Sequence, residues 1–406
     1  MSDLKDHKQI GQELELFFTS DIAPGAPFWL PKGMVIFKEL EKYIRELTEK
    51  AGYLETSTPV MVKSDLFKQS GHWEKFGEHN MYNLQLSDEA DDSNPVTYSL
   101  KPMNCPESII LYRFRQRSYR ELPLRLSEIG RLHRREKSGE VNGLLRVRQL
   151  TMDDAHIYAS EDQIFDEVSK ILDMMISFYK MFGFEYDFRL ATRPEVRAGS
   201  DENWDKAETA LTDALDKKSI KAGDKMGDGA FYGPKIDVHI KDSQGRDWQL
   251  ATVQLDFHMP EAFKLEYIDA DGKKKRPVMV HRAIFGSFER FIAILTEQYQ
   301  GAFPTWLSPI QVQIIPIADR HNKYAQNVLE HLMSANIRVE IDTKAEKMQS
   351  KIRDAQLQKI PYMLIIGDRE EEQKTVAVRT RDEKDLGAMD INKFIDKITL
   401  EINTRK

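Results

Sequence analysis

The chain has 406 residues, of which 41% are hydrophobic and 31% are charged, a balance typical of globular proteins and not of disordered or membrane-embedded ones. No apolar run approaches the roughly 20 residues that a membrane-spanning helix needs, and the first eight residues lack the apolar core of a signal peptide, so we expect a cytoplasmic protein. The formal net charge of −7 argues against nonspecific coating of nucleic acid, and the single cysteine excludes an internal disulfide and multi-cysteine zinc modules.

The first helices and strands are predicted from the spacing of apolar residues and from the glycine and proline residues that end them. Apolar residues at helical spacing over 36–47, followed by Gly52, predict a helix with a glycine cap. The β-branched segment 55–61, with Pro59 at its centre, predicts an edge strand or a strand end. Residues 85–96 are acidic and rich in turn formers, which predicts a solvated hairpin or loop. Pro106, directly after Cys105, suits the first turn of an apolar helix.

The chain is organised around residues 144–158. Residues 124–130 and 144–158 read as strands joined by a charged, glycine-containing loop, which predicts a long antiparallel hairpin. Because side chains alternate along a strand, one face of the second strand would carry Arg146, Arg148, Leu150, Met152, Asp154 and His156. A strand that faces a core does not normally align such groups. A pocket for a phosphorylated ligand at one end and a metal at the other would require them.

The remaining pattern predicts an α+β fold. Ser160 and Gln163 form a capping box before an apolar helical stripe that Gly183 ends. Residues 196–225 read as a charged surface insertion, and further strands follow at 235–240, 248–257 and 277–285. After a linker at 304–309, strands and helices alternate, which predicts a small α/β domain with a mixed sheet. We therefore expect a first domain at 1–303, mainly an antiparallel sheet with helices around it, and a second domain at 310–406.

Two groups of side chains suggest chemistry. Cys105, His156 and His281 lie in separate elements, and on composition alone each is more often structural than a ligand; a catalytic zinc ion needs three such ligands and an open fourth position. Arginines 134, 146, 148 and 290 are ordinarily surface ion-pair formers, but guanidinium groups also bind phosphates bidentately. No phosphate-binding loop or dinucleotide fingerprint is present, so any use of ATP follows a different design.

Six short segments, taken in order, resemble class II aminoacyl-tRNA synthetases. The segments around Pro59, at 134–136 and at 286–290 resemble the three class motifs, for the dimer interface and for ATP binding. Lys101-Pro-Met-Asn-Cys105-Pro, Asp153-Asp-Ala-His156 and Val280-His281-Arg-Ala resemble threonyl-tRNA synthetases, and the resemblance covers essentially the whole chain. It implies that residues 1–303 form the catalytic domain and residues 310–406 an anticodon-binding domain. It also implies a homodimer that makes threonyl-adenylate from L-threonine and ATP with Mg²⁺, and then transfers threonine to the 3′ end of tRNA(Thr).

The resemblance also implies residue roles. Cys105, His156 and His281 would hold one Zn²⁺ per chain, which would select threonine by its amine and hydroxyl. The catalytic residues would be Arg134, Glu136, Arg146 and Arg290, and the residues that contact threonine would be Asp154, Tyr232, Met152 and Lys235. ATP would be contacted by Arg134, Glu136, Arg146, Leu150, Gln249, Thr252, Gln254, Ser287 and Arg290. The anticodon would be contacted by Lys347, Glu370 and Arg379. Leu150 and Met152 stand where the family usually has Phe and Gln, and Ser108, Ile129 and Ala345 also depart from its pattern.

Two other interpretations stay open at this point. An inactive synthetase-like binding subunit would be expected to lose the motif arginines, yet Arg134 and Arg290 are present. A synthetase for another amino acid, such as proline or serine, would carry no zinc, so metal content separates it from the threonine enzyme.

The family's amino-terminal editing domain, which hydrolyses seryl-tRNA, has no room before Met1, so we expect no editing in cis, whether the chain is naturally short or trimmed. Serine keeps the hydroxyl and lacks one methyl group, a difference worth only roughly 1–3 kcal/mol. We therefore predict measurable seryl-tRNA when the chain is assayed with serine and tRNA(Thr). Complete absence of that product would contradict the prediction.

Overall fold

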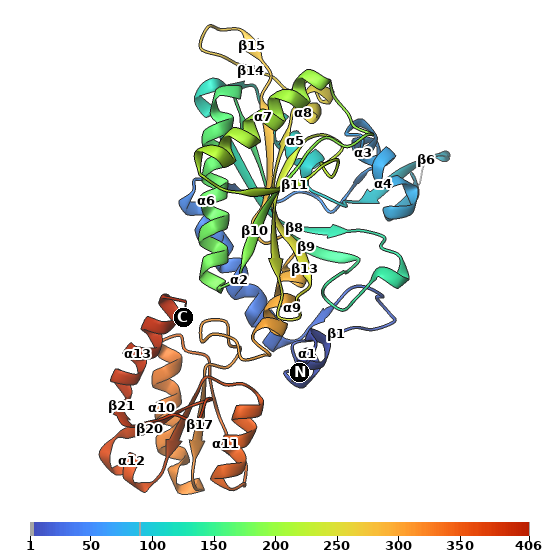
Figure 1. Ribbon diagram of the computed structural model, residues 1–406. Helices are drawn as coiled ribbons and strands as arrows, with labels where there is room; N and C mark the ends of the chain where they lie inside the picture. The colour runs from blue at the N-terminus through green and yellow to red at the C-terminus, as the bar shows by residue number, and fades with distance from the viewer. Residues whose placement is uncertain (1–3, 89–90, 406) are drawn as a thin grey trace. The chain divides into compact units, whose positions relative to one another are not determined.

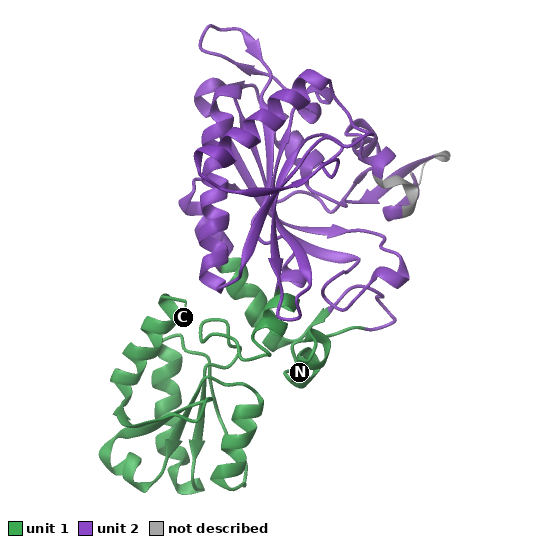
Figure 2. Ribbon diagram, in the orientation of Figure 1, with its two compact units in different colours: residues 1–19, 28–42, 292–406 green, residues 20–27, 43–291 purple. Residues whose placement is uncertain are grey.

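The computed structural model describes residues 4–88 and 91–405, which form two compact units (Figures 1 and 2). Unit 2 comprises residues 20–27 and 43–291, and unit 1 comprises residues 1–19, 28–42 and 292–406. The long helices α2 (Pro31–Lys50) and α9 (Phe288–Gln298) each contribute residues to both units. Helix α2 ends before Gly52, whose φ of 75° allows the left-handed turn that the sequence predicted.

Unit 2 is built on an eight-stranded sheet. Its strands, in spatial order, are β11 (Ala222–Lys225), β10 (Tyr186–Ala191), β12 (Lys235–Lys241), β13 (Asp247–Asp256), β16 (Val278–Ala283), β9 (Gln149–Ala159), β8 (Leu124–His133) and β3 (Leu54–Glu55). The central pairs are antiparallel, and only the edge pairs β11/β10 and β8/β3 are parallel. The predicted edge strand before Pro59 is therefore confirmed as β3.

Two small sheets and several helices complete unit 2. The small sheets are β4 (Met61–Lys63), β6 (Asp91–Leu100) and β5 (Asn83–Asp88), and β15 (Lys274–Lys275), β14 (Tyr267–Ile268) and β7 (Arg117–Ser118). The helices are α3 (Asp65–Gln69), α4 (His72–Asn80), α5 (Cys105–Arg113), α6 (Ile164–Phe182), α7 (Asp201–Lys217) and α8 (His258–Ala262). Strands β5 and β6 form the predicted acidic hairpin, although residues 89–90 of that segment lie outside the described residues.

The predicted central hairpin is present, but its second strand is shorter than expected. β8 and β9 pair antiparallel from Leu124 opposite Tyr158 to His133 opposite Gln149. Residues 144–148 do not belong to β9, because Asn142 pairs with Arg146 in a tight turn and the Arg148 amide donates to the Gly25 carbonyl. The expectation that Arg146 and Arg148 lie on this strand is therefore wrong, whereas Leu150, Met152, Asp154 and His156 do lie on it.

The predicted capping box before α6 is confirmed, and one expectation beyond α6 is wrong. Ser160 and Gln163 cap the first turn, and Gly183 ends the helix at a φ of 69°. Residues 196–225 are not a surface insertion: α7 buries Trp204 and Leu211 while it packs beside α6, and β11 extends the main sheet (Figure 1). The buried residues of α7 are all apolar, and the many charged residues around them made the whole segment look solvated in the sequence.

Unit 1 contains a five-stranded mixed sheet, as predicted for the last hundred residues. In spatial order the strands are β18 (Val339–Ile341), β17 (Val312–Pro316), β19 (Tyr362–Ile366), β20 (Thr375–Thr380) and β21 (Asp385–Asp390), and the helices are α10 (Asn322–Ser334), α11 (Met348–Leu357), α12 (Asp368–Gln373) and α13 (Ile391–Asn403). One face buries Val312, Leu364 and Phe394 among others, and the opposite face packs Ile315 and Met363 against α11. Unit 1 also holds α1 (His7–Glu13), β1 (Phe17–Phe18) and β2 (Phe28–Trp29).

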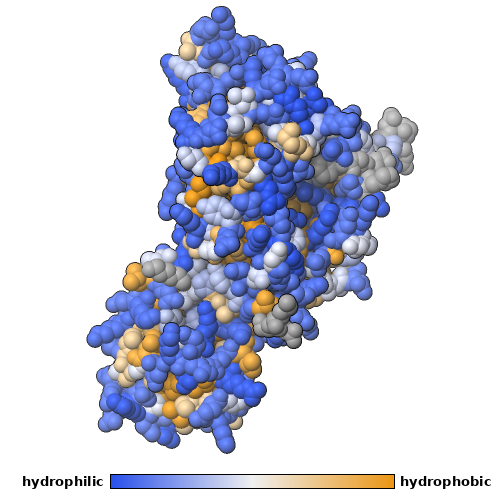
Figure 3. Space-filling view, viewed as in Figure 1, coloured by the Kyte–Doolittle hydropathy of each residue, from blue (hydrophilic) through white to orange (hydrophobic). Residues whose placement is uncertain are grey.

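The structure thus confirms the α+β class. The sequence did not predict α12 or β21, because both are short and polar. The exact domain boundaries at 303 and 310 stay a prediction. Among the described residues, no helix is long and apolar enough to cross a membrane, and the face drawn in Figure 3 is largely hydrophilic.

A buried ion pair joins three segments of unit 2. The Lys101 ammonium, at the end of β6 and 1% exposed, donates to Glu128 Oε1 on β8 at 2.7 Å and to Thr58 Oγ1 at 2.7 Å. Glu128 also accepts from the Thr58 amide at 3.0 Å. These bonds fix the segment before Pro59 and the segment before Cys105 against the central hairpin.

We predict that Lys101→Met lowers the free energy of unfolding by about 3–5 kcal/mol, because it leaves the Glu128 carboxylate buried without a counter-ion. Lys68→Met is the matched control: its ion pair with Asp65 lies at the surface, where such a pair contributes less than ~1 kcal/mol. Urea denaturation of both variants measures the difference, and equal losses would contradict the importance of the buried pair.

Candidate metal and nucleotide site

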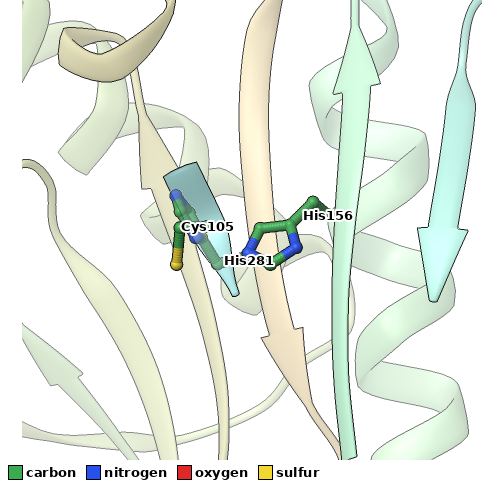
Figure 4. Close-up of side chains that lie close together, drawn as sticks. All are labelled: Cys105, His156 and His281. Atoms are coloured by element: carbon green, nitrogen blue, oxygen red, sulfur yellow. The ribbon is translucent and has the colours of Figure 1, made fainter. Parts of the chain in front are cut away.

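Three elements of unit 2 bring Cys105, His156 and His281 together. Cys105 is the first residue of α5, and the two histidines lie directly opposite each other on the antiparallel strands β9 and β16. Their ligand atoms all lie within 4.8 Å of one another, and all three residues are buried (Figure 4). The structure therefore assembles the three residues that the sequence could relate only by resemblance.

The hydrogen bonds and burial of the two histidines suit a metal site. His281 Nε2 lies 3.0 Å from Asp256 Oδ2, and because a carboxylate accepts, Nε2 carries the hydrogen and Nδ1 keeps its lone pair. Within the described residues, His281 Nδ1 and His156 Nε2 are buried without a hydrogen-bond partner. Burial lowers the pKa of His156 well below its usual value, so this imidazole is neutral near pH 7. Two imidazoles and one cysteine sulfur form a donor set that fits zinc with an open fourth position.

Asp154 lies beside this cluster. Its Oδ1 is 3.9 Å from His156 Nε2, and its Oδ2 accepts a hydrogen bond from Asn104 Nδ2 at 3.0 Å. Burial raises the pKa of Asp154 to about 6, while the bond from Asn104 opposes that shift. A carboxylate of this kind can accept from a ligand hydroxyl next to the metal position.

Four further predicted residues, Tyr232, Gln254, Thr252 and Lys235, lie next to this cluster or on neighbouring strands. The Tyr232 ring stacks on the His281 ring at 4.9 Å, and its hydroxyl donates to Gln254 Oε1 at 2.6 Å. Gln254 Nε2 in turn donates to Thr252 Oγ1 at 3.2 Å. Tyr232 reaches this position because Gly233 packs on β13, where a Cβ atom would lie 1.8 Å from the Leu255 carbonyl oxygen. Lys235 lies on the neighbouring strand β12, and its ammonium is 2.8 Å from Asp237 Oδ2.

The predicted arginines converge on one side of the cluster. Arg134, Glu136 and Arg146 line a single cavity of about 310 Å³, in which Arg146 pairs with Glu136 at 2.7 Å. The Arg290 Nε donates to the Leu145 carbonyl at 3.0 Å, and its backbone amide donates to Ser287 Oγ at 3.2 Å. Burial and the positive charges of Arg134 and Arg146 lower the pKa of Arg290. Several cations held this close together form a binding site for a polyanion such as a triphosphate.

Leu150 and Met152, the two residues of β9 that depart from the family pattern, belong to an apolar cluster. Leu150 is buried with Leu132 and Val147, and Met152 packs against that cluster. The Met152 backbone also pairs with Ser287. The contacts of Leu150 with ATP and of Met152 with threonine stay a prediction.

Other predicted site residues are not assembled here. Gln249 lies on β13 opposite His239, and within the part of the chain that the structure describes it makes no hydrogen bond or ion pair with the cluster. The three predicted anticodon contacts all lie in unit 1. Lys347 precedes α11 and is exposed, and Glu370 Oε2 accepts from the Gly367 amide at 3.0 Å. Arg379 lies on β20 opposite Met363. Among the described residues, no hydrogen bond or ion pair joins these three to one another.

The sequence analysis missed three polar neighbours of the site. Asp256 orients His281, and Asn104 binds Asp154. His72 packs its ring edge-on against Phe231, and its ring centroid lies 6.2 Å from that of Tyr232. Burial lowers the pKa of His72 to about 3. Only Asn104 had a signal in the sequence, namely its place next to Cys105; the other two come from segments with no recognisable spacing.

Comparison with known proteins gives consistent relationships. Residues 82–299 match the family "tRNA synthetase class II core domain (G, H, P, S and T)", and residues 311–401 match "Anticodon binding domain". The chain is 50% identical over 401 residues to the threonine–tRNA ligase of Caldanaerobacter subterraneus subsp. tengcongensis, and 53% identical over 401 residues to that of Clostridium botulinum (strain Hall). The match covers 99% of this chain but only 61% and 62% of those relatives, so the chain spans less than two thirds of their length.

A solved structure is also similar. The crystal structure of the RNA-binding domain of threonyl-tRNA synthetase from Cryptosporidium parvum Iowa II superposes with a TM-score of 0.93 and 39% identity, and the match covers 98% of each chain. The putative threonyl-tRNA synthetase ThrRS-1 of Aeropyrum pernix gives a TM-score of 0.83 at 26% identity. The similarity in sequence and in fold therefore extends over nearly the whole chain.

We predict close to one zinc ion per chain by elemental analysis, and loss of most of it in Cys105→Ser and in His156→Ala, because three protein ligands are needed to hold the ion. His239→Ala is the control, since this buried histidine pairs with Asp247 at 2.9 Å away from the cluster. A zinc content that is unaffected by the cluster variants would show that the ion binds elsewhere.

Proposed function

The chain belongs to the threonyl-tRNA synthetase family, and on that basis we propose that it activates L-threonine with ATP and transfers the threonyl group to the 3′ end of tRNA(Thr). In the first step, a threonine carboxylate oxygen forms a bond to the α-phosphorus of ATP, and the bond from that phosphorus to pyrophosphate breaks. In the second step, a ribose hydroxyl of the tRNA attacks the threonyl carbonyl carbon, and AMP leaves. Mg²⁺ accompanies ATP.

The cluster of Cys105, His156 and His281 is the observation that carries this proposal. Zinc held there would accept the amine and hydroxyl of threonine as further ligands, and this explains how a hydroxyl could be selected over the methyl of isosteric valine. An apolar pocket alone discriminates such a pair only about 10²-fold. Asp154 would accept the hydrogen of the threonine hydroxyl, and Tyr232 would help to hold the amino group, since its ring packs on His281.

The arginines would act on ATP. Arg134 and Arg290 would bind its phosphates and stabilise the charge that develops at the α-phosphorus, with Arg146 held in the same cavity by Glu136. Thr252, Gln254 and Ser287 would add polar contacts, and Lys235 and Gln249 would contribute from β12 and β13. Leu150 and Met152 would form the apolar wall. Most of the catalysis would then come from positioning and electrostatics, with no covalent enzyme intermediate.

Two further assignments complete the proposal. Lys347, Glu370 and Arg379 would contact anticodon bases, and their exposed or half-buried positions in unit 1 support this role. The active form would be a homodimer. The residues around Pro59 support it, because Leu54, Val60 and Met61 expose 59%, 36% and 45% of their surface, as an apolar interface requires.

We predict that the chain catalyses threonine-dependent exchange of pyrophosphate into ATP, that proline gives no exchange, and that a zinc chelator abolishes the reaction. Arg290→Ala should reduce kcat/KM by about 10²–10³-fold, because it removes charge stabilisation at the reacting phosphate. Arg113→Ala, an exposed arginine at the end of α5, is the control and should exchange normally. Absence of threonine-dependent exchange in the zinc-loaded chain would refute the proposed function.

A further inference from the structure

The Asn104 side chain does not make the helix-capping hydrogen bond that its position allows. It is the N-cap residue of α5, and asparagine is among the preferred residues there because its side chain can accept from the first free amides. The Asn104 side chain makes no such bond. It is fully buried, and its Nδ2 donates to Asp154 Oδ2 at 3.0 Å instead.

The other atom of this amide has no partner. Among the described residues, Asn104 Oδ1 is buried and accepts no hydrogen bond. A flipped amide would place Oδ1 against the carboxylate, which can only repel it, so the observed orientation is the favourable one. An unsatisfied buried carbonyl is a cost to stability, and such costs are typical of functional sites. The bond to Asp154 is therefore the interaction that accounts for an asparagine at this position.

Gly130 makes the room that this arrangement needs. On β8, a Cβ atom at Gly130 would lie 2.4 Å from Asn104 Oδ1 and 2.5 Å from its Nδ2. The φ of Gly130 is not in the left-handed region, so the backbone does not require glycine here and only the space does. Gly130 therefore allows the amide to lie flat against the hairpin, within reach of Asp154.

The bond fixes one oxygen of Asp154 and leaves the other free. Among the described residues, Asn104 is the only side chain that donates a hydrogen bond to Asp154. With Oδ2 held, Oδ1 lies on the side of the metal cluster, 3.9 Å from His156 Nε2. Without this bond the carboxyl group could rotate about its terminal torsion, which is broad for aspartate.

We propose that Asn104 is a positioning residue that, together with Gly130, holds Asp154 with Oδ1 presented to the hydroxyl of the amino acid. This proposal rests on the proposed function, in which Asp154 accepts from threonine. Asn104 would act on threonine recognition through Asp154, whereas ATP binding by the arginines would not depend on it.

The test is pyrophosphate exchange by the zinc-loaded full chain carrying Asn104→Ala. We expect the KM for threonine to rise about 10- to 100-fold, as the loss of a hydrogen bond to a charged group would give, with the KM for ATP and the zinc content unchanged. Gly130→Ala should reproduce this effect by displacing the amide. Gly223→Ala on β11 is the matched control, because its Cβ would meet only ordinary contacts at 3.8 Å or more.

A double-variant comparison separates action through Asp154 from direct contact with the ligand. Asn104→Ala should weaken threonine binding, measured by calorimetry, in the native chain but not further in the Asp154→Ala background. An unchanged threonine KM, an equal rise in the KM values for threonine and ATP, or loss of zinc would each overturn the proposal. If the Asn104→Ala variant does not fold, the same threonine and ATP measurements are made on Gly130→Ala, with and without Asp154→Ala. If the native chain itself gives no threonine-dependent exchange, the proposed function fails, which is a different outcome from failure of the variants alone.

Discussion

The register between β9 and β16 is the constraint on which the site depends. His156 and His281 face each other across an antiparallel pair, which brings their ring centroids to 5.0 Å. Side chains alternate along a strand, so a slip by one residue would send either histidine to the opposite face of the sheet. The helix that begins at Cys105 then supplies the third ligand from outside the sheet. The cluster of Cys105, His156 and His281 therefore depends on strand pairing, and a change of register would separate its members.

The same alternation separates the two neighbouring aspartates, Asp153 and Asp154. The Asp153 carboxylate is buried on the far face, where it pairs with Arg282 and accepts from the Ile284 and Phe285 amides at 2.7 and 3.2 Å. These bonds hold the turn that leads from β16 into α9. Asp154 faces the cluster instead and has one hydrogen-bond donor, Asn104. One carboxylate thus maintains the fold and the next is left available to a ligand, because the backbone turns them to opposite sides.

Buried polar bonds also fix the segments around the site. Glu289, at the start of α9, accepts from the Thr151 amide at 2.9 Å, so the helix that carries Arg290 is fastened to the strand that carries His156. Burial raises the pKa of Glu289 to about 7. The ion pair of Lys101 and Glu128 does the same for the segment before Cys105. Buried hydrogen bonds and ion pairs therefore fasten the segment that carries Arg290 and the segment that precedes Cys105 to the central hairpin.

The sequence by itself determined the elements whose signals are local. The capping box at Ser160, the glycine cap at Gly183, the β8/β9 hairpin and the alternating strands and helices after residue 310 all follow from residues a few positions apart. Only the tertiary structure decided that Arg146 and Arg148 lie outside β9 and that α7 packs on α6. It also decided that Asp256, Asn104 and His72 lie around the cluster of Cys105, His156 and His281. These outcomes depend on contacts between segments far apart in the chain, and neither periodicity nor local spacing contains information about such contacts. Resemblance to a family identified Cys105, His156 and His281 in advance, but their approach to within 4.8 Å is a property of the folded sheet.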